Sequence, residues 1–491
     1  MNQRGFLFLF ILALLASGTL HSMGIFPDMS RESSISKENL TPSQKNTTTS
    51  DSIYIDKIFI IGNRKTKDKI IRRELDIKPG MLLPETELDE ILENNRKKIM
   101  NTRLFLSVSI EVVKLSDDTA DLIINVRERW YFFPAPIFEL ADRNFTEWWV
   151  NQQRDMSRVE YGLRLRQYNF RGRNETVSVT AQFGYTKLFR LSYRIPYINS
   201  KQKLGLFFYA DYATRKNIEA LTIEHRQQFA DLDYVAKERF RGGAFLSYRP
   251  SFYNYHQFGA FFSSSNIADT IAQINPNYFS GGNLLQRYFG LQYNYTLDHR
   301  DDIGYPLKGS LVRLQVTQTG IGIYDDVSIF KLNLKYNRYA DLGKKFYLAT
   351  SVSGSVTFPK DQPYNNYNGI GFNKHFIRGF ERYIIEGQHY IINNNSVKLQ
   401  VLDLKFSLSK IMPIKQFSSI PIAAYITANF DQGFISNYKN YENNDRFSNK
   451  YLAGGGIGID IVSFYDFVMR WEYSFNIAGE SALYLNILAA F

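Results

Sequence analysis

The sequence predicts a mainly β protein, in which a small α+β domain precedes a sixteen-stranded antiparallel transmembrane β-barrel. Three observations favour this class. The 491 residues include 33 Tyr and 39 Phe, an excess typical of strands that meet a membrane interface. Beyond residue 134, apolar and polar side chains alternate with a period of two. No later apolar run is long enough to cross a bilayer as a helix, so a membrane-bound chain would have to span it as a barrel.

The N-terminal segment is expected to be removed or to stay unfolded. The apolar run from Phe6 to Ala16 follows Arg4 and precedes small residues, a pattern typical of a secretory signal peptide. We therefore assign residues 1–22 to a signal peptide, with a buried N-terminal helix as the alternative. Residues 23–50 are rich in Ser, Thr, Asn and Lys, which predicts a disordered linker.

Residues 51–128 predict the small α+β domain, with elements in the order β, α, α, β, β. A strand-like run from Tyr54 ends at a Gly-Asn turn, and Thr66 is expected to cap the following helix. A second helix from about Thr86 would place four apolar residues on one face, namely Leu88, Ile91, Leu92 and Ile99. Two strands then complete the domain, whose alternative interpretation is a plain two-layer packing unit.

The segment 134–491 predicts the barrel. In one run the apolar residues Val159, Tyr161, Leu163 and Leu165 share a face opposite Arg158, Glu160, Arg164 and Arg166. Such a strand suits lipid outside and water inside, although a soluble sandwich could show the same period. About 358 residues would allow sixteen strands at roughly 22 residues per strand and connection. The last strand ends on Phe491, in register with its apolar face.

Composition argues against several kinds of chemistry. The absence of Cys excludes thiol catalysis, Cys-ligated zinc and disulfides, and the six His form no metal-ligand motif. We therefore predict no enzyme, no catalytic or metal site and no cofactor. The net charge of +11 is spread along the chain, and anionic lipid would attract it as well as nucleic acid would. We predict no nucleic-acid partner.

Three separated motifs occur within the barrel segment. The first runs from Asp298 and Arg300 to Pro306 and Gly309, and it predicts a turn because Pro fixes φ and Gly frees the backbone. A simple hairpin would explain it equally. The second lies in a polar stretch from 359 to 395, and the third on a late strand. Their residues are Ile377, Arg378, Gly379 and Phe380, and then Phe430, Asp431 and Gly433.

The last two motifs predict a contact inside the barrel. Successive strand residues face opposite ways, so Asp431 points into the lumen if Phe430 faces outward. There Asp431 could accept a bidentate pair from Arg378, which would fix the tip of a loop that folds back into the lumen. In a water-filled lumen this pair would be only partly desolvated.

These motifs, in this order, resemble the BamA/TamA outer-membrane assembly superfamily, also called the bacterial surface antigen family. Residues 51–128 resemble one POTRA domain, and Phe491 resembles the closing-strand signal of outer-membrane barrels. One departure is the run SVKLQ at 396–400, where the family commonly has Glu and Arg. The resemblance implies a weak seam between the first and last strands. The glycines of the run 454–458 would either lower local sheet stability or relieve crowding under the inward loop.

The resemblance implies a barrel of the bacterial outer membrane that assists folding and insertion of β-barrel proteins. Its POTRA domain would lie in the periplasm and receive clients by β-augmentation. A protein secretion pore and a passive porin or transporter are the alternatives, and a barrel hydrolase would need a paired Ser and acid that do not stand out. The implied partners are unfolded outer-membrane proteins or a secreted passenger, lipid and lipopolysaccharide, and periplasmic or lipoprotein accessory factors.

Overall fold

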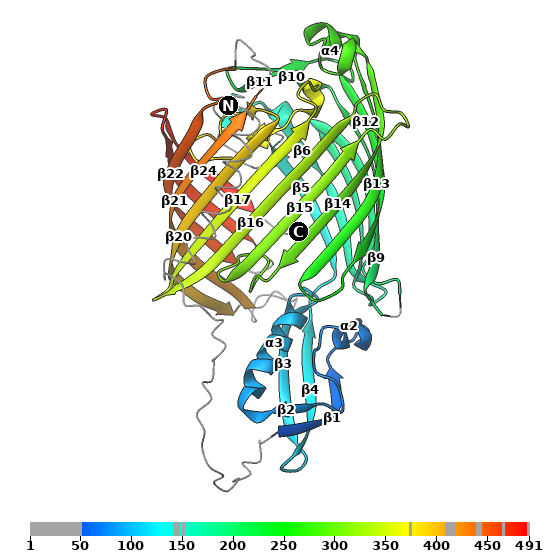
Figure 1. Ribbon diagram of the computed structural model, residues 1–491, viewed down its shortest axis with the longest axis vertical. Helices are drawn as coiled ribbons and strands as arrows, with labels where there is room; N and C mark the ends of the chain where they lie inside the picture. Colours follow the sequence, from blue (N-terminus) through cyan, green and yellow to red (C-terminus); the bar gives the residue numbers. More distant parts are fainter. Residues whose placement is uncertain are drawn as a thin grey trace, which may run out of the picture.

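The computed structural model describes residues 52–140, 148–149, 153–199, 201–372, 376–407, 419–437, 444–463 and 467–488. Over these ranges the chain forms a small N-terminal domain and a sixteen-stranded antiparallel sheet rolled into a barrel (Figure 1). The predicted fold class is confirmed. The predicted signal peptide, the linker and the terminal Phe491 lie outside the described residues. Within the described ranges, none of the helices is long and apolar enough to cross a membrane.

The N-terminal domain packs its helices on a four-stranded sheet in the order β2-β1-β4-β3. Its elements are β1 (Ser52–Ile61), α2 (Asp68–Arg72), β2 (Leu82–Pro84), η1 (Glu85–Glu87), α3 (Leu88–Met100), β3 (Phe105–Lys114) and β4 (Thr119–Glu128). The predicted apolar face of α3 is confirmed, because Leu88 and Ile99 are buried in the core and Ile91 and Leu92 pack against it. The predicted order lacked β2, since three residues ending in Pro show no alternation.

Thr66 does not cap α2, contrary to the prediction. The residue before the helix is Lys67, which makes no side-chain cap. The Thr66 hydroxyl instead donates to Glu128 Oε1 at 2.6 Å, and it accepts from Asn169 Nδ2 of the barrel at 2.8 Å. The side chain therefore joins the two domains, a role that the local sequence could not indicate.

The barrel is built from sixteen strands, each antiparallel to its neighbours. They are β5 (Phe132–Leu140), β6 (Val159–Phe170), β7 (Glu175–Gly184), β8 (Thr186–Ile195), β9 (Leu204–Arg215), β12 (Lys237–Tyr248), β13 (Asn254–Ile267), β14 (Leu285–Asp298), β15 (Gly309–Thr319), β16 (Ile329–Gly343), β17 (Phe346–Phe358), β20 (His389–Ser407), β21 (Ser419–Ser436), β22 (Tyr451–Ser463), β23 (Val468–Asn476) and β24 (Ser481–Leu488). The first strand begins two residues before the expected boundary at 134. At the ends of the strand order, the described residues of β5 and β24 form no ladder with each other.

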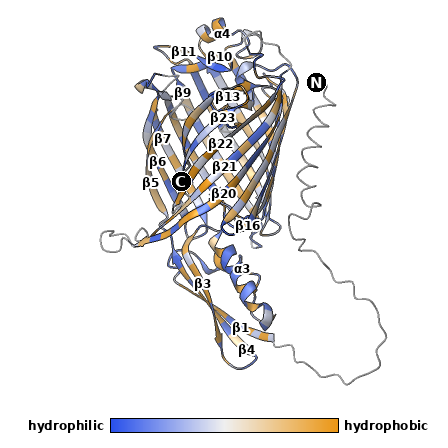
Figure 2. Ribbon diagram, turned by 90° about the vertical axis from the view of Figure 1, so that its left-hand side faces the viewer, coloured by the Kyte–Doolittle hydropathy of each residue, from blue (hydrophilic) through white to orange (hydrophobic). Residues whose placement is uncertain are grey.

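Side chains alternate across the barrel wall as predicted. On β6, Tyr161 and Leu163 are exposed on the outer face, whereas Arg164 and Arg166 point to the lumen. Tyr161 packs on its cross-strand neighbour Phe183, with ring centroids 6.2 Å apart. Apolar and polar residues alternate along the strands in Figure 2. Large apolar side chains exposed on so many strands require an apolar surrounding, which identifies the outer face as the lipid-facing one.

The two ends of the barrel differ. The end next to the N-terminal domain is called the proximal end, and the other is called the distal end (Figure 1). The distal end carries β10 (Asn217–Ile223), β11 (Arg226–Asp231), α4 (Asp269–Ile274) and η4 (Ser280–Gly282), and η3 (Met156–Arg158) precedes β6. Residues 359–388 connect β17 to β20, contain η5 (Tyr364–Asn366), β18 (Gly369–Ile370) and β19 (Ile385–Glu386), and are called the inner loop. The inner loop occupies only part of the polar stretch 359–395, because residues 389–395 already belong to β20.

Candidate functional site

Ile377 and Phe380 anchor the inner loop to the inner wall of the barrel. Both side chains are fully buried in a cluster that includes Ile392 of β20 and Leu452 of β22. Gly433 of β21 faces this cluster, and a Cβ added there would approach Ile377 Cδ1 to 2.7 Å. The second and third motifs are therefore brought together by apolar packing as well as by charge.

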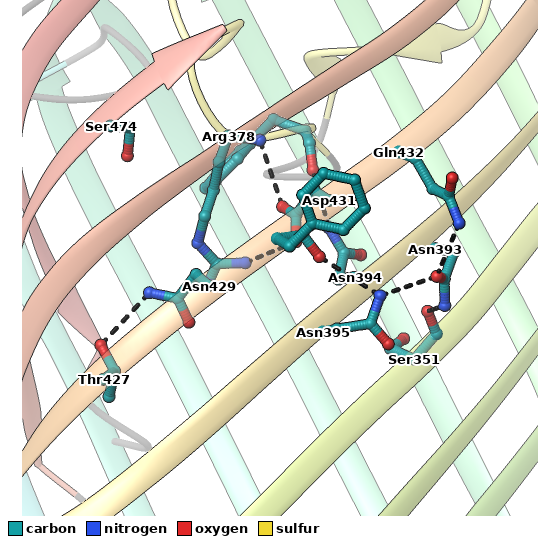
Figure 3. A network of polar contacts seen from close by, with 12 residues as sticks. Ser351, Arg378, Asn393, Asn394, Asn395, Thr427, Asn429, Asp431, Gln432 and Ser474 are labelled. Carbon is teal, nitrogen blue, oxygen red and sulfur yellow. Dashed lines mark hydrogen bonds and ion pairs between the residues drawn. The ribbon is translucent and has the colours of Figure 1, made fainter.

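Arg378 lies between two carboxylates from different strands. Its Nη1 donates to Asp431 Oδ1 at 2.7 Å, and its backbone N–H donates to Asp431 Oδ2 at 3.1 Å (Figure 3). Its Nε forms an ion pair with Glu472 Oε1 of β23 at 2.5 Å. The guanidinium thus bridges β21 and β23, whereas a bidentate pair with Asp431 alone was expected.

Burial of this group is deeper than predicted. The side chains of Arg378, Asp431 and Glu472 are only 10%, 1% and 4% exposed. At this burial water screens the three charges less than it would in an open channel. The two ion pairs therefore fix the position of the inner loop against the barrel wall.

The predicted orientation of β21 is confirmed. Phe430 is 52% exposed on the outer face, and Asp431 beside it is buried on the inner one. The sequence analysis did not identify Glu472, although the alternation along β23 would have indicated its position. Trp471 and Tyr473 on either side are both exposed on the outer face, so the alternation of β23 places Glu472 in the lumen.

Glycines let the inner loop approach the wall. A Cβ on Gly454 of β22 would lie 1.9 Å from the carbonyl oxygen of Arg378. Gly379 has φ +81°, and a Cβ there would meet the backbone of Phe475 at 2.6 Å. Asn476 Nδ2 donates to the Gly379 carbonyl oxygen at 2.6 Å. These contacts favour crowding relief as the reason for Gly454, which lies on β22 and not on an edge strand.

The first motif forms the turn between β14 and β15 at the proximal end. Arg300 donates to both oxygens of Asp298, from Nε at 2.8 Å and from Nη2 at 2.6 Å. Gly309 has φ +98°, and a Cβ there would lie 2.0 Å from the His299 carbonyl oxygen. Pro306 lies within the same turn. The motif is thus a structured turn that reaches into the lumen, where the Tyr305 hydroxyl donates to Asp460 Oδ2 of β22 at 2.8 Å. Lys398 of β20 lies 3.9 Å from the centroid of the Tyr305 ring.

A second polar group lies on the outer face of β17, β20 and β21. Asn395 Nδ2 donates to Asn393 Oδ1 at 2.7 Å, and Gln432 Nε2 donates to the same oxygen at 3.3 Å (Figure 3). Thr350 Oγ1 donates to Asn395 Oδ1 at 2.7 Å. We call these four residues the outer amide network. The side chains satisfy one another, which lowers the cost of placing amides on a lipid-facing surface.

The N-terminal domain is held to the proximal end by a buried ion pair. Arg249, in the turn after β12, donates to Glu74 from Nη1 at 3.0 Å and from Nη2 at 3.2 Å. Tyr197 lies beside this pair, and the guanidinium of Arg73 stacks 3.8 Å from its ring centroid. Burial, reinforced by the Glu74 carboxylate, raises the pKa of Tyr197 to about 12. We call the Glu74–Arg249 pair the domain latch.

His225 joins the turn between β10 and β11 to residues 444–450 at the distal end. The Phe447 backbone N–H donates to His225 Nε2 at 3.0 Å, and the two rings stack with centroids 5.1 Å apart. Burial lowers the pKa of His225 to about 4. The neutral ring is therefore the form that holds these two segments together near neutral pH.

The described residues contain no group of three or more His, Cys, Asp or Glu that could hold a metal ion. The polar groups described above are hydrogen-bonded ion pairs and amide clusters, whose evident task is to position a loop, a domain and neighbouring strands.

A lipid-facing barrel with an inner loop and a docked N-terminal domain defines a class of outer-membrane-type proteins. The chain belongs to the Omp85 superfamily, whose domain model matches residues 169–463. A POTRA model, described as a surface antigen variable number repeat, matches residues 53–129. The predicted family, with one POTRA domain plus a barrel, is confirmed, and the N-terminal domain is called the POTRA domain below.

Two solved structures share this fold. One is the crystal structure of BamA from Haemophilus ducreyi lacking POTRA domains 1–3, with a TM-score of 0.50 and 16% identity over 89% of this chain and 84% of that chain. The other is CdiB from Escherichia coli, with a TM-score of 0.52 and 11% identity over 92% of this chain and 93% of that chain. At these identities the likeness establishes the architecture and no finer property.

Proposed function

We propose that this protein acts in the bacterial outer membrane on other proteins, and that it assists the folding and insertion of β-barrel clients. Membership of the Omp85 superfamily supports a general role in outer-membrane insertion or secretion. The more specific insertion role rests on the geometry of the barrel edges. In this proposal the protein has no catalytic activity and needs no cofactor.

The observation that carries the proposal is the junction of the first and last strands. The described residues of β5 and β24 form no ladder with each other, whereas every other neighbouring pair of barrel strands does. Unpaired strand edges carry backbone donors and acceptors that another strand can satisfy. In hydrocarbon such groups have no water to bond with, which favours pairing with an incoming client strand.

The POTRA domain offers a second free edge. Its sheet order leaves β3 as an outer strand, and this strand is ten residues long. An extended client segment could pair with it by backbone hydrogen bonds, largely independent of client sequence. We place the POTRA domain and the proximal end in the periplasm, where unfolded clients, lipid or lipoprotein accessory factors would meet it.

Depletion in the native host tests the proposal. Folded outer-membrane barrel proteins would be quantified by mass spectrometry before and after loss of this protein, with plasmid-borne wild type as the control. A fall in several barrel proteins, restored by the plasmid, would support insertion. Unchanged barrels with loss of a single secreted protein would replace it by the secretion role, and loss of a solute flux alone would favour a passive transporter.

A further inference from the structure

A pocket of about 440 Å³ lies at the proximal mouth of the barrel, between the POTRA domain and the lumen wall. Residues 101–104 of the POTRA domain and residues 129–131, which connect β4 to β5, form one side of it. The barrel wall forms the other side, with residues of β5, β6, β7, β8, β13 and β14 and of four proximal turns. Its volume is within the range of sites that hold ligands.

The lining combines positive charge with aromatic rings. Seven Arg and eight aromatic residues line the pocket, against two carboxylates, Glu74 and Asp298. Both carboxylates are already engaged, Glu74 by Arg249 in the domain latch and Asp298 by Arg300 in the turn motif. Arg164 pairs with Glu139 outside the lining at 4.0 Å, and the lining itself holds seven Arg against two carboxylates.

Arg166 and Arg194 are held by neutral oxygens. Arg166 Nη1 donates to the Tyr168 hydroxyl at 2.8 Å, and Arg194 Nη2 lies 3.5 Å from the Tyr255 hydroxyl. A guanidinium has five N–H donors, so each retains donors after these contacts. Phenol hydroxyls orient the two groups without neutralising them, an arrangement suited to a carboxylate or phosphate that arrives from outside.

We propose that this pocket binds an acidic, aromatic-containing segment of a polypeptide. Carboxylates of the segment would pair with Arg166 and Arg194, and its aromatic side chains would pack against the rings that line the pocket. A polypeptide is favoured over a lipid headgroup because the pocket lies between the POTRA domain and the lumen, and not on the lipid-facing surface. This inference rests on the proposed function, since it identifies where a client would first contact the barrel.

Peptide binding to the full-length protein in nanodiscs tests the inference. The probe is a fluorescein-labelled ten-residue peptide of alternating Glu and Phe, and the matched peptide carries Gln in place of Glu. We expect the acidic peptide to bind at least tenfold more tightly by fluorescence anisotropy. The double variant Arg166→Gln, Arg194→Gln should weaken that binding at least tenfold.

The matched control is Lys331→Gln, which removes one positive charge from the lumen face of β16 outside the pocket. It should leave peptide affinity unchanged. Heat-modifiable migration in gels would establish that each variant barrel is folded, and Arg194→Lys offers a second variant if the double change prevents folding. Lysine retains the positive charge but lacks the planar, bidentate donors of the guanidinium, so it should lower peptide affinity less than glutamine does.

Equal affinity for the two peptides would overturn the inference, and so would an equal loss of peptide affinity in the Lys331→Gln control. Displacement of the peptide by glycerol phosphate at equal concentration would also overturn it, because it would assign the pocket to a lipid headgroup. Failure here is distinguishable from failure of the proposed function. A peptide that does not bind, in a protein whose depletion still lowers barrel levels, contradicts the pocket alone.

Discussion

Replacing Arg378 by alanine should release the inner loop from the barrel wall. The arginine side chain contacts two carboxylates on separate strands, and both are almost completely buried. Removing it leaves Asp431 and Glu472 facing each other without a cation. The backbone bond from residue 378 to Asp431 and the packing of Ile377 and Phe380 would remain.

The magnitude follows from the burial of the stranded charges. Removing one partner of a buried ion pair costs about 3–5 kcal/mol. Because each 1.4 kcal/mol corresponds to a factor of ten, the ratio of docked to released loop should fall by more than about a hundredfold. A lysine at this position keeps the charge but cannot bridge two carboxylates as the planar guanidinium does, so it should give an intermediate loss.

Limited proteolysis measures the effect directly. Protease added to the folded barrel should cut the alanine variant within residues 359–388 and leave the wild type intact there, as read by mass spectrometry. The triple variant Arg378→Ala, Asp431→Asn, Glu472→Gln also removes the two unpaired carboxylate charges. It should therefore regain barrel stability, while the inner loop stays cleavable. Complementation of the depleted host should fail for both variants. Full protection and full activity of Arg378→Ala would refute the view that this ion pair holds the loop.

Three further changes probe other parts of the molecule. Glu74→Gln should weaken the domain latch with Arg249 and broaden the distance between spin labels placed on the two domains; an unchanged distance would mean that other contacts dominate. Gly454→Ala should displace the inner loop and expose it to protease, whereas Gly242→Ala on β12, with space for a methyl group, should not. The His225 pKa is lower in the folded protein than in the unfolded chain, so its contribution to stability is present above about pH 6.5 and is lost as pH falls toward 4. Amide exchange at the distal end should show that loss, and His225→Phe should abolish its pH dependence.

The period-two alternation of apolar and polar residues was sufficient to predict most of the fold and part of the candidate site. It was enough to place Asp431 in the lumen and Phe430 outside, because a strand fixes side-chain direction residue by residue. The same rule applied to β23 would have found Glu472. It could not find the start of β20, since the asparagines at 393–395 are polar on both faces. A strand can be recognised in the sequence only when its two faces differ in polarity, and strand propensity alone is not enough.

Contacts between residues far apart in the sequence could not be predicted, for a different reason. Thr66 matched a helix cap by its local sequence, yet its hydroxyl bonds Glu128 and its oxygen accepts from Asn169. The proximal pocket likewise draws residues from the POTRA domain, from the segment between β4 and β5 and from several barrel strands. Neither arrangement leaves a pattern along the chain, because each depends on how two domains dock.

The bracing of the wall has a mechanical consequence. On the inner face Arg378 ties β21 to β23, and on the outer face the outer amide network ties β17, β20 and β21. This sector is fastened on both sides, while β5 and β24 share no ladder in the described residues. The braced sector ends at β23, which is the neighbour of β24, so within one strand the wall changes from cross-tied strands to an edge whose described residues form no ladder with β5. We therefore expect lateral stress from the bilayer to widen the β5–β24 junction before it displaces the inner loop, because fewer backbone hydrogen bonds resist separation at the junction.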